Sequence, residues 1–202
     1  MNPAEAGRAL LLDVDGVLVL PPQMFGSALM TRHPETVRAF FAGPFLEAST
    51  GRADLRDLLP PLLQQIGYAG TLDDFLNEWF GSENHPNTPL LEALKDLRRA
   101  GWPIFLATNQ ERHRLKYLLD DMKLGQMTDG EFSSASVGQR KPHPAYFAQV
   151  AAALGIPAAR IVFWDDVAEN VEAARTAGWT AHLYESVAQF QQVMEATSVQ
   201  SR

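Results

Sequence analysis

Three apolar runs of the chain each end in residues that can bind a metal ion or a phosphate. These residues are Asp13 and Asp15 after the first run, Thr108 and Asn109 after the second, and Asp165 and Asp166 at the end of the third. Carboxylates that converge without a cation repel one another, and an all-oxygen set of Asp ligands suits Mg²⁺, which also accepts a phosphate oxygen. Lys141 and the hydroxyl of Thr108 could hold the remaining phosphate charge. The residue types therefore predict a magnesium site that handles phosphate.

The elements that must position these residues alternate between strand and helix patterns. Continuous apolar runs are typical of strands buried on both faces, and the helical patterns between them are each followed by glycine. Strands are predicted at 9–15, 102–108 and 160–165, weaker strands at 131–134 and 180–184, and helices at 89–100, 144–154 and 167–177. This alternation predicts an α/β fold with a doubly wound, Rossmann-like parallel sheet. Ligands bind at the carboxyl ends of such strands, so the polar residues should meet in one crevice.

Residues 20–88 interrupt this alternation and show helical patterns only. These patterns cover 34–41, 53–66 and 72–80, separated by Pro and Gly. Pro21-Pro22 on one side and a segment rich in Asn and Pro on the other have the composition of hinges. We therefore predict an inserted all-helical cap domain at 20–88 and a catalytic core formed by residues 1–19 and 89–202.

The composition restricts the classes of function. The chain has 202 residues, no cysteine and a formal net charge of −7. The absence of cysteine excludes disulfides and thiol nucleophiles, and an acidic balance without a basic run disfavours a nucleic-acid partner. The N-terminal segment has the pattern of neither a signal peptide nor a membrane span. We expect a cytoplasmic protein that binds neither nucleic acid nor membrane, and the sequence predicts no particular oligomeric state.

Four short motifs occur in the order and spacing of a known superfamily. They are Asp13-Val14-Asp15-Gly16-Val17-Leu18, then Thr108-Asn109, then Lys141-Pro142, then Asp165-Asp166-Val167-Ala168-Glu169-Asn170. Across roughly residues 8 to 185 these motifs resemble those of the haloacid dehalogenase superfamily, and the helical insertion after the first motif resembles its type 1 cap. A single Asp-x-Asp is weak evidence, whereas four ordered motifs that each adjoin a predicted strand or helix are specific.

The resemblance implies a role for each matching residue of the first three motifs. Asp13 would be the nucleophile that attacks phosphorus and also a metal ligand. Asp15 would protonate the leaving group and then activate water, while its main-chain carbonyl binds Mg²⁺. Thr108 and the main chain at Asn109 would hold phosphoryl oxygens, and the same pair is also expected to cap a helix at 110–122. Lys141 would neutralise the nucleophile and the phosphate.

The fourth motif differs from the commonest form of the superfamily, Gly-Asp-x-x-x-Asp. Asp165 occupies the glycine position and Asn170 the position of the last aspartate. This variant resembles a phosphatase subgroup that includes sugar-1-phosphate phosphatases and the N-terminal phosphatase domain of soluble epoxide hydrolase. Asp166 is expected to be the main metal ligand. Asp165 is either a further ligand or, together with Asn170, a supporting group that orients Asp166 and Lys141.

The implied activity is Mg²⁺-dependent hydrolysis of a small phosphate monoester, such as a sugar phosphate or phosphoglycolate, through an aspartyl phosphate. A sugar phosphomutase shares every core motif and differs in the cap. A 2-haloacid dehalogenase needs no protonation of its leaving group and usually lacks the second aspartate. A catalytically silent phosphate-binding scaffold should have a damaged motif, and Asp13, Asp15, Lys141 and Asp166 are all present.

Overall fold

Five parallel strands form the centre of the molecule. The computed structural model describes residues 1–199. The strands are β1 (Ala9–Leu12), β2 (Ile104–Thr108), β3 (Gly130–Ser133), β4 (Ile161–Asp165) and β5 (Thr180–Leu183). Their order is β3-β2-β1-β4-β5, so the chain builds outward from β1 in one direction and then in the other. The predicted doubly wound parallel sheet is confirmed, and its direction of winding changes beside β1.

Both faces of the sheet are covered, which explains the continuous apolar runs. In β1, Leu10 and Leu12 belong to one hydrophobic cluster, and Ala9 and Leu11 belong to a second cluster on the opposite face. All four side chains are fully buried. Successive side chains of a strand point to opposite faces, so a strand between two helical layers needs apolar residues at every position.

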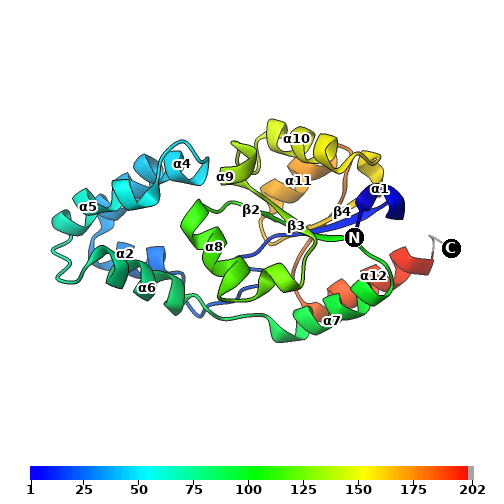
Figure 1. Ribbon diagram of the computed structural model, residues 1–202, viewed down its shortest axis with the longest axis horizontal. Coiled ribbons are helices and arrows are strands. Elements are labelled where there is room, and N and C mark those ends of the chain that lie inside the picture. The colour runs from blue at the N-terminus through cyan, green and yellow to red at the C-terminus, as the bar shows by residue number, and fades with distance from the viewer. Residues whose placement is uncertain (200–202) are drawn as a thin grey trace.

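Two helical layers cover the sheet (Figure 1). The helices of these layers are α7 (Thr88–Arg99), α8 (Arg112–Asp120), α10 (Pro144–Leu154), α11 (Ala168–Thr176) and α12 (Val187–Val199). One layer contributes to the first cluster through Leu94 of α7, Leu118 of α8 and Phe190 of α12. The other contributes to the second cluster through Phe147 of α10 and Val171 of α11. Short helices complete this part: α1 (Pro3–Ala6), η1 (Leu124–Gln126), α9 (Ser134–Val137) and η2 (Ala158–Arg160).

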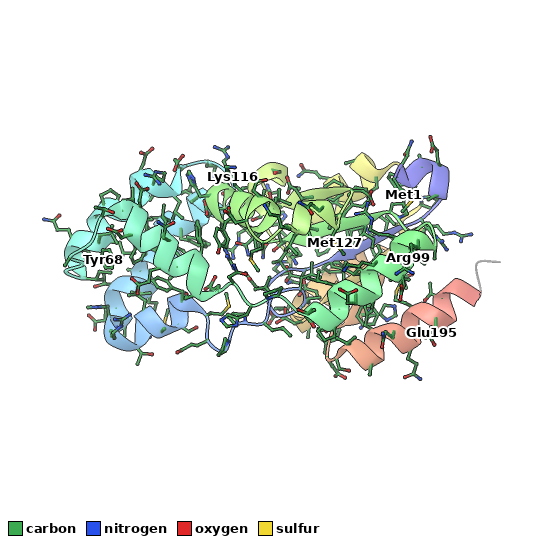
Figure 2. The ribbon with its side chains drawn as sticks, turned by 60° about the horizontal axis from the view of Figure 1, so that its bottom comes forward. Met1, Tyr68, Arg99, Lys116, Met127 and Glu195 are labelled. Atoms are coloured by element: carbon green, nitrogen blue, oxygen red, sulfur yellow. The ribbon has the colours of Figure 1, made fainter. Side chains whose placement is uncertain are left out.

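The segment between β1 and α7 is helical and packs mainly on itself. Its helices are α2 (Phe25–Arg32), α3 (Pro34–Ala42), α4 (Pro44–Ser49), α5 (Leu55–Gln65) and α6 (Leu72–Ser82). They share a third hydrophobic cluster that includes Phe25, Leu59, Phe75 and Trp79 and is distinct from the two clusters on the sheet. Tyr68 lies at the outer end of this segment and Glu195 at the opposite end of the molecule (Figure 2). The boundaries of a cap domain at residues 20 and 88 stay a prediction.

None of the helices within residues 1–199 combines the length and apolar character that crossing a membrane requires.

Candidate active site

Asp13 lies directly after β1, at the carboxyl end of the sheet. Its main-chain N–H donates to the carbonyl of Trp164 at 2.9 Å, which extends the pairing of β1 with β4 by one bond. Its Oδ1 accepts a hydrogen bond from the N–H of Val14 at 2.7 Å and lies 3.1 Å from Nζ of Lys141. The pKa of Asp13 is raised from 3.8 to about 7, mainly by burial; Asp165 and Asp15 also contribute to the rise, and Lys141 opposes it. Asp13 is therefore a carboxylate for which a nearby cation would be strongly favourable.

A tight turn follows Asp13 and requires Gly16. The N–H of Gly16 donates to the carbonyl of Val19 at 2.9 Å, and its φ of +80° lies in the left-handed region that other residues rarely adopt. A Cβ atom at this position would lie 2.0 Å from Oδ2 of Asp166. Gly16 thus allows the first motif to approach the Asp166 carboxylate closely.

Lys141 lies beneath Asp13, and its ammonium group is fully engaged by the protein. Nζ donates to the carbonyl of Ala107 at 2.6 Å and to Oδ2 of Asp165 at 2.5 Å, and it pairs with Asp13. The side chain has no exposed surface. A buried ammonium with three acceptors is held in one position, so it is a fixed positive charge beside Asp13.

Asn109 positions Lys141 through the main chain. Its Oδ1 accepts from the N–H of Lys141 at 2.9 Å, and its Nδ2 donates to the carbonyl of Lys141 at 3.0 Å. These two bonds join the loop after β2 to the loop before α10. Thr108, which precedes Asn109, is almost completely buried and lines the same crevice as Asp13.

Asp165 is the last residue of β4 and is completely buried. Besides the bond from Lys141, it receives hydrogen bonds from the N–H of Val167 at 2.8 Å and from Nδ2 of Asn170 at 3.0 and 3.1 Å. Both carboxylate oxygens therefore already have donors within the protein. Asn170 in turn is buried and packed beneath the fourth motif.

Asp166, in contrast, is exposed to the crevice. One carboxylate oxygen from each of Asp13, Asp165 and Asp166 lies within 4.8 Å of the other two. Burial, and then the neighbouring Asp165, raise the pKa of Asp166. Three carboxylates at this spacing, with raised pKa values at two of them, form an oxygen-only donor set that fits a hard divalent cation such as Mg²⁺.

The cavity beside this cluster, called the core crevice below, has a volume of about 410 Å³. It is lined by Asp13, Asp15, Gly16, Leu20, Pro21, Met24, Thr108, Asn109, Asp166, Val167 and Asn170. The structure therefore brings together every residue that the sequence analysis selected, with Lys141 and Asp165 buried behind the crevice. The expectation that Thr108 and Asn109 cap the helix after β2 is wrong. Glu111 caps α8, because its carboxylate accepts from the N–H groups of His113 and Arg114.

Asp15 also lines the crevice and has two partners that the sequence analysis did not predict. Its Oδ2 accepts from Nε2 of Gln110 at 2.6 Å, and its Oδ1 lies 3.9 Å from Nη2 of Arg114. Burial raises the pKa of Asp15, while Arg114 and the Gln110 hydrogen bond oppose this effect. A carboxyl group with a raised pKa can donate a proton at a pH where a free aspartate cannot.

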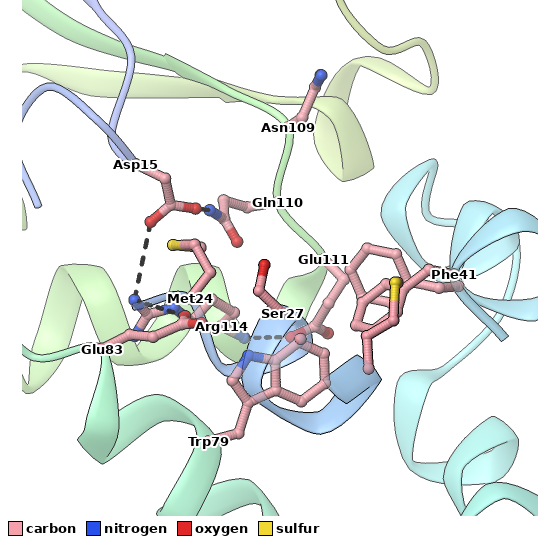
Figure 3. Close-up of a pocket in the computed structure, with 13 residues that line it drawn as sticks. Asp15, Met24, Ser27, Phe41, Trp79, Glu83, Asn109, Gln110, Glu111 and Arg114 are labelled. Carbon is pink, nitrogen blue, oxygen red and sulfur yellow. Dashed lines mark hydrogen bonds and ion pairs between the residues drawn. The ribbon is translucent and has the colours of Figure 1, made fainter. Parts of the chain in front are cut away.

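Arg114 joins this side of the core to the helical segment. Its Nη2 lies 3.3 Å from Oε2 of Glu83, which follows α6, and its Nη1 donates to the carbonyl of Phe80 at 3.3 Å. Figure 3 shows Arg114 between Asp15 and Glu83. Gln110 directly follows the Thr108-Asn109 motif, which is the one sequence signal that could have indicated it. Arg114, within α8, and Glu83, directly after α6, carry no such signal.

Comparisons with known proteins agree with this fold. A sequence model of the haloacid dehalogenase-like hydrolase family matches residues 8–178, and the chain belongs to this family. A phosphoglycolate phosphatase from Pseudomonas savastanoi pv. phaseolicola is 36% identical over 181 residues, which cover 85% of this chain and 66% of that protein. A phosphatase from Mycobacterium tuberculosis is 36% identical over 92 residues, which cover 45% of this chain and 42% of that protein. The chain thus spans 66% or less of the length of these relatives.

Among solved structures, a HAD family enzyme from Bacteroides thetaiotaomicron in complex with magnesium has a TM-score of 0.76. It is 19% identical, and the match covers 93% of this chain and 98% of that chain. At this level of identity the likeness concerns the fold, including the helical insertion after the first strand.

Proposed function

We propose that this chain is a Mg²⁺-dependent phosphatase that hydrolyses a small phosphate monoester. The observation that carries the proposal is the arrangement at the strand ends. Asp13 lies 3.1 Å from a buried ammonium, and its carboxylate forms a cluster within 4.8 Å with those of Asp165 and Asp166. A second carboxyl group, Asp15, lines the same crevice. This set supplies a nucleophile, a cation site and a proton donor for phosphoryl transfer.

Asp13, Asp166 and the main-chain carbonyl of Asp15 would hold Mg²⁺. When bound, the ion would neutralise the negative charge that Asp13 and the phosphate bring together. We assign Asp165 to a different role, because both of its oxygens already accept hydrogen bonds from Lys141, Val167 and Asn170. Asp165 and Asn170 would hold Lys141 in place beside Asp13.

In the first half-reaction, a carboxylate oxygen of Asp13 would attack phosphorus as the bond from phosphorus to the ester oxygen breaks. Asp15 would donate its proton to that leaving oxygen, which departs as an alcohol. The raised pKa of Asp15 supports this role, because burial favours its protonated form. Lys141 and the loop of Thr108 and Asn109 would stabilise the charge on the transferring phosphoryl group.

In the second half-reaction, Asp15, now ionised, would take a proton from water while the water oxygen attacks phosphorus. The bond from phosphorus to Asp13 breaks, which releases inorganic phosphate and restores the Asp13 carboxylate. The names of relatives support this chemistry: one is a phosphoglycolate phosphatase, and the Bacteroides enzyme has also been solved with magnesium and inorganic phosphate.

We also propose that residues 20–88 form the cap and that residues 1–19 and 89–202 form the core, of which 200–202 lie outside the described residues. The two chain segments that connect the core to the cap run side by side. The N–H of Leu20 donates to the carbonyl of His85 at 2.8 Å, and the N–H of Asn87 donates to the carbonyl of Leu18 at 2.8 Å. Paired connections of this kind let a cap move as a unit over the crevice.

Release of inorganic phosphate from an aryl phosphate tests the proposal. We expect release with Mg²⁺, loss of release with a chelator, and trapping of a phosphorylated Asp13 by hydroxylamine. Failure to release phosphate with Mg²⁺ would refute the proposal. Transfer of the phosphate to another sugar hydroxyl would instead identify a mutase.

A further inference from the structure

A second cavity adjoins the core crevice on the side of the helical segment. This cap cavity has a volume of about 290 Å³ and shares Asp15, Met24 and Asn109 with the core crevice. It therefore lies next to the proposed proton donor, where the alcohol part of a phosphate ester would sit.

Most of the wall surface of the cap cavity is apolar, although seven of its thirteen lining residues are polar or charged. Its apolar side chains are Met24, Met30, Phe41, Phe45 and Trp79. The aromatic rings pack against one another: Phe41 and Phe45 have centroids 4.9 Å apart, and each lies 5.9 Å from Trp79. Apolar and aromatic walls bind apolar surface through loss of water contact and offer few hydrogen bonds to hydroxyl groups.

The charged groups at the base of the cap cavity disfavour an anion. Among the described residues 1–199 that line the cap cavity or the core crevice, Arg114 is the only cation. Its guanidinium lies near Asp15 and Glu83, while the Glu111 carboxylate, which also lines the cap cavity, accepts from the main-chain N–H of Arg114. Arg114 is 3% exposed, lies 3.3 Å from the Glu83 carboxylate, and has the rings of Phe80 and Tyr117 within 5.6 Å. Its charge is therefore paired with that of Glu83, although Nε and Nη2 of Arg114 have no hydrogen-bond partner. A carboxylate on the leaving group would meet the acidic side chains of Asp15, Glu83 and Glu111.

The first turn of α8 is also closed to an anion. Helix N-termini bind anions through free N–H groups, but the Glu111 carboxylate accepts from the N–H groups of His113 and Arg114 in that turn. Those two N–H groups are therefore not free to bind an anion.

We infer that the preferred substrate is the phosphate monoester of a small, neutral, apolar alcohol, alkyl or aryl. This inference rests on the proposed phosphatase function and replaces the sugar phosphate or phosphoglycolate that the sequence analysis expects. An apolar cavity of about 150 Å³ is sufficient for benzene. The cap cavity, at about 290 Å³, has room for a single ring with a short chain or for an alkyl chain of similar volume.

A substrate series tests this inference. The Mg²⁺-loaded protein is given ethyl, butyl, hexyl and phenyl phosphate, with phosphoglycolate and glucose 6-phosphate as polar esters. We expect kcat/KM to rise roughly two- to fourfold per added methylene, and to be at least about tenfold lower for phosphoglycolate than for butyl phosphate. A higher kcat/KM for either polar ester than for butyl phosphate would overturn the inference and leave the phosphatase function standing. No phosphate release from any ester would refute the phosphatase function itself.

A charge inserted into the cap cavity gives a second test. Met30→Lys places a cation among the apolar walls, and Met127→Lys makes the same change in a half-buried methionine that lies over the core, away from the cap (Figure 2). We expect Met30→Lys to raise the ratio of kcat/KM for phosphoglycolate to that for butyl phosphate at least tenfold, while Met127→Lys leaves it unchanged. Equal ratios in the two variants, both folded by circular dichroism, would contradict the inference.

Discussion

The core crevice and the cap cavity meet at Asp15 and are built differently. Behind the core crevice, Lys141 and Asp165 are completely buried, and each of their polar atoms has a hydrogen-bond partner. In the cap cavity, Phe41 and Phe45 are partly exposed, and Oδ1 of Asp15 has no hydrogen-bond partner. Directional bonds fix Lys141 and Asp165 behind the site of phosphoryl transfer, whereas the apolar walls of the cap cavity are held by packing. Substitutions should therefore abolish chemistry in the first region and only change substrate preference in the second.

The largest effect is expected for Asp13→Asn, which replaces the proposed nucleophile by a neutral amide of the same shape. Turnover should fall by roughly 10⁴-fold or more, because removal of a nucleophile eliminates the reaction path. Phosphate release and a thermal melt of the same preparations provide the measurement. Asp121→Asn, on the exposed end of α8, is the matched control and should retain activity. Normal activity of the Asp13 variant would refute the assignment of Asp13 as the nucleophile.

A smaller effect separates Asp165 from Asp166 within the core crevice. Asp166→Ala should raise the Mg²⁺ concentration needed for half-maximal activity by roughly 10- to 100-fold, because it removes an exposed ligand. Asp165→Ala should leave that concentration closer to the wild-type value and reduce kcat, because it frees Lys141. Activity titrated with Mg²⁺ in both variants gives the ranking. The reverse ranking would show that Asp165 is the main ligand.

The dependence of stability on pH should reveal the buried carboxylate. In the folded chain without metal, the pKa of Asp13 is about 7, compared with an ordinary value of 3.8. Since the folded state binds this proton more tightly than the unfolded state, the free energy of unfolding should fall as pH rises between these values, by on the order of 4 kcal/mol. Mg²⁺ binds the ionised form, so it should raise Tm more at pH 8 than at pH 5. Equal stabilisation at both pH values, or the same pattern in Asp13→Asn, would contradict this origin.

The smallest effect is expected in the cap cavity. Phe41→Ala removes one wall and should lower kcat/KM for phenyl phosphate roughly 3- to 10-fold, because an aromatic contact is lost. The value for methyl phosphate, which does not reach the wall, should stay the same. Steady-state kinetics with the two esters give the comparison, and an equal loss for both would mean that Phe41 supports the fold and not the substrate.

The sequence predicted the core of the fold well, because both faces of the sheet are buried and every strand that carries the site is an unbroken apolar run. Helix α10 has the predicted bounds, since His143 and Pro144 start it and Gly155 ends it. Helix α2 was not predicted because Met24 provides no side-chain cap. Its first N–H, on Phe25, donates to the carboxylate of the distant Glu83 at 2.8 Å. Such a cap between segments leaves no local pattern.

The residues of the site also divide into those marked by a local sequence pattern and those placed only by contacts between distant segments. The selected aspartates and Lys141 follow strands or adjoin recognisable motifs, so topology places them together. Gln110 and Arg114 contact Asp15, and Glu83 pairs with Arg114, only because α8 and the residue before its cap lie near Asp15 and the end of α6. Their residue types alone are those of ordinary helix surfaces.

The pairing of β1 with β4 has a consequence for the order of events during folding. Asp13 and Asp165 are separated by 152 positions (165 minus 13), and their loops come together only when these two strands pair. Contacts between residues so distant in the chain form late, because a long loop must close first. A chain shortened before β4 would therefore contain Asp13 but lack Asp165 and Asp166, and the carboxylate cluster could not form.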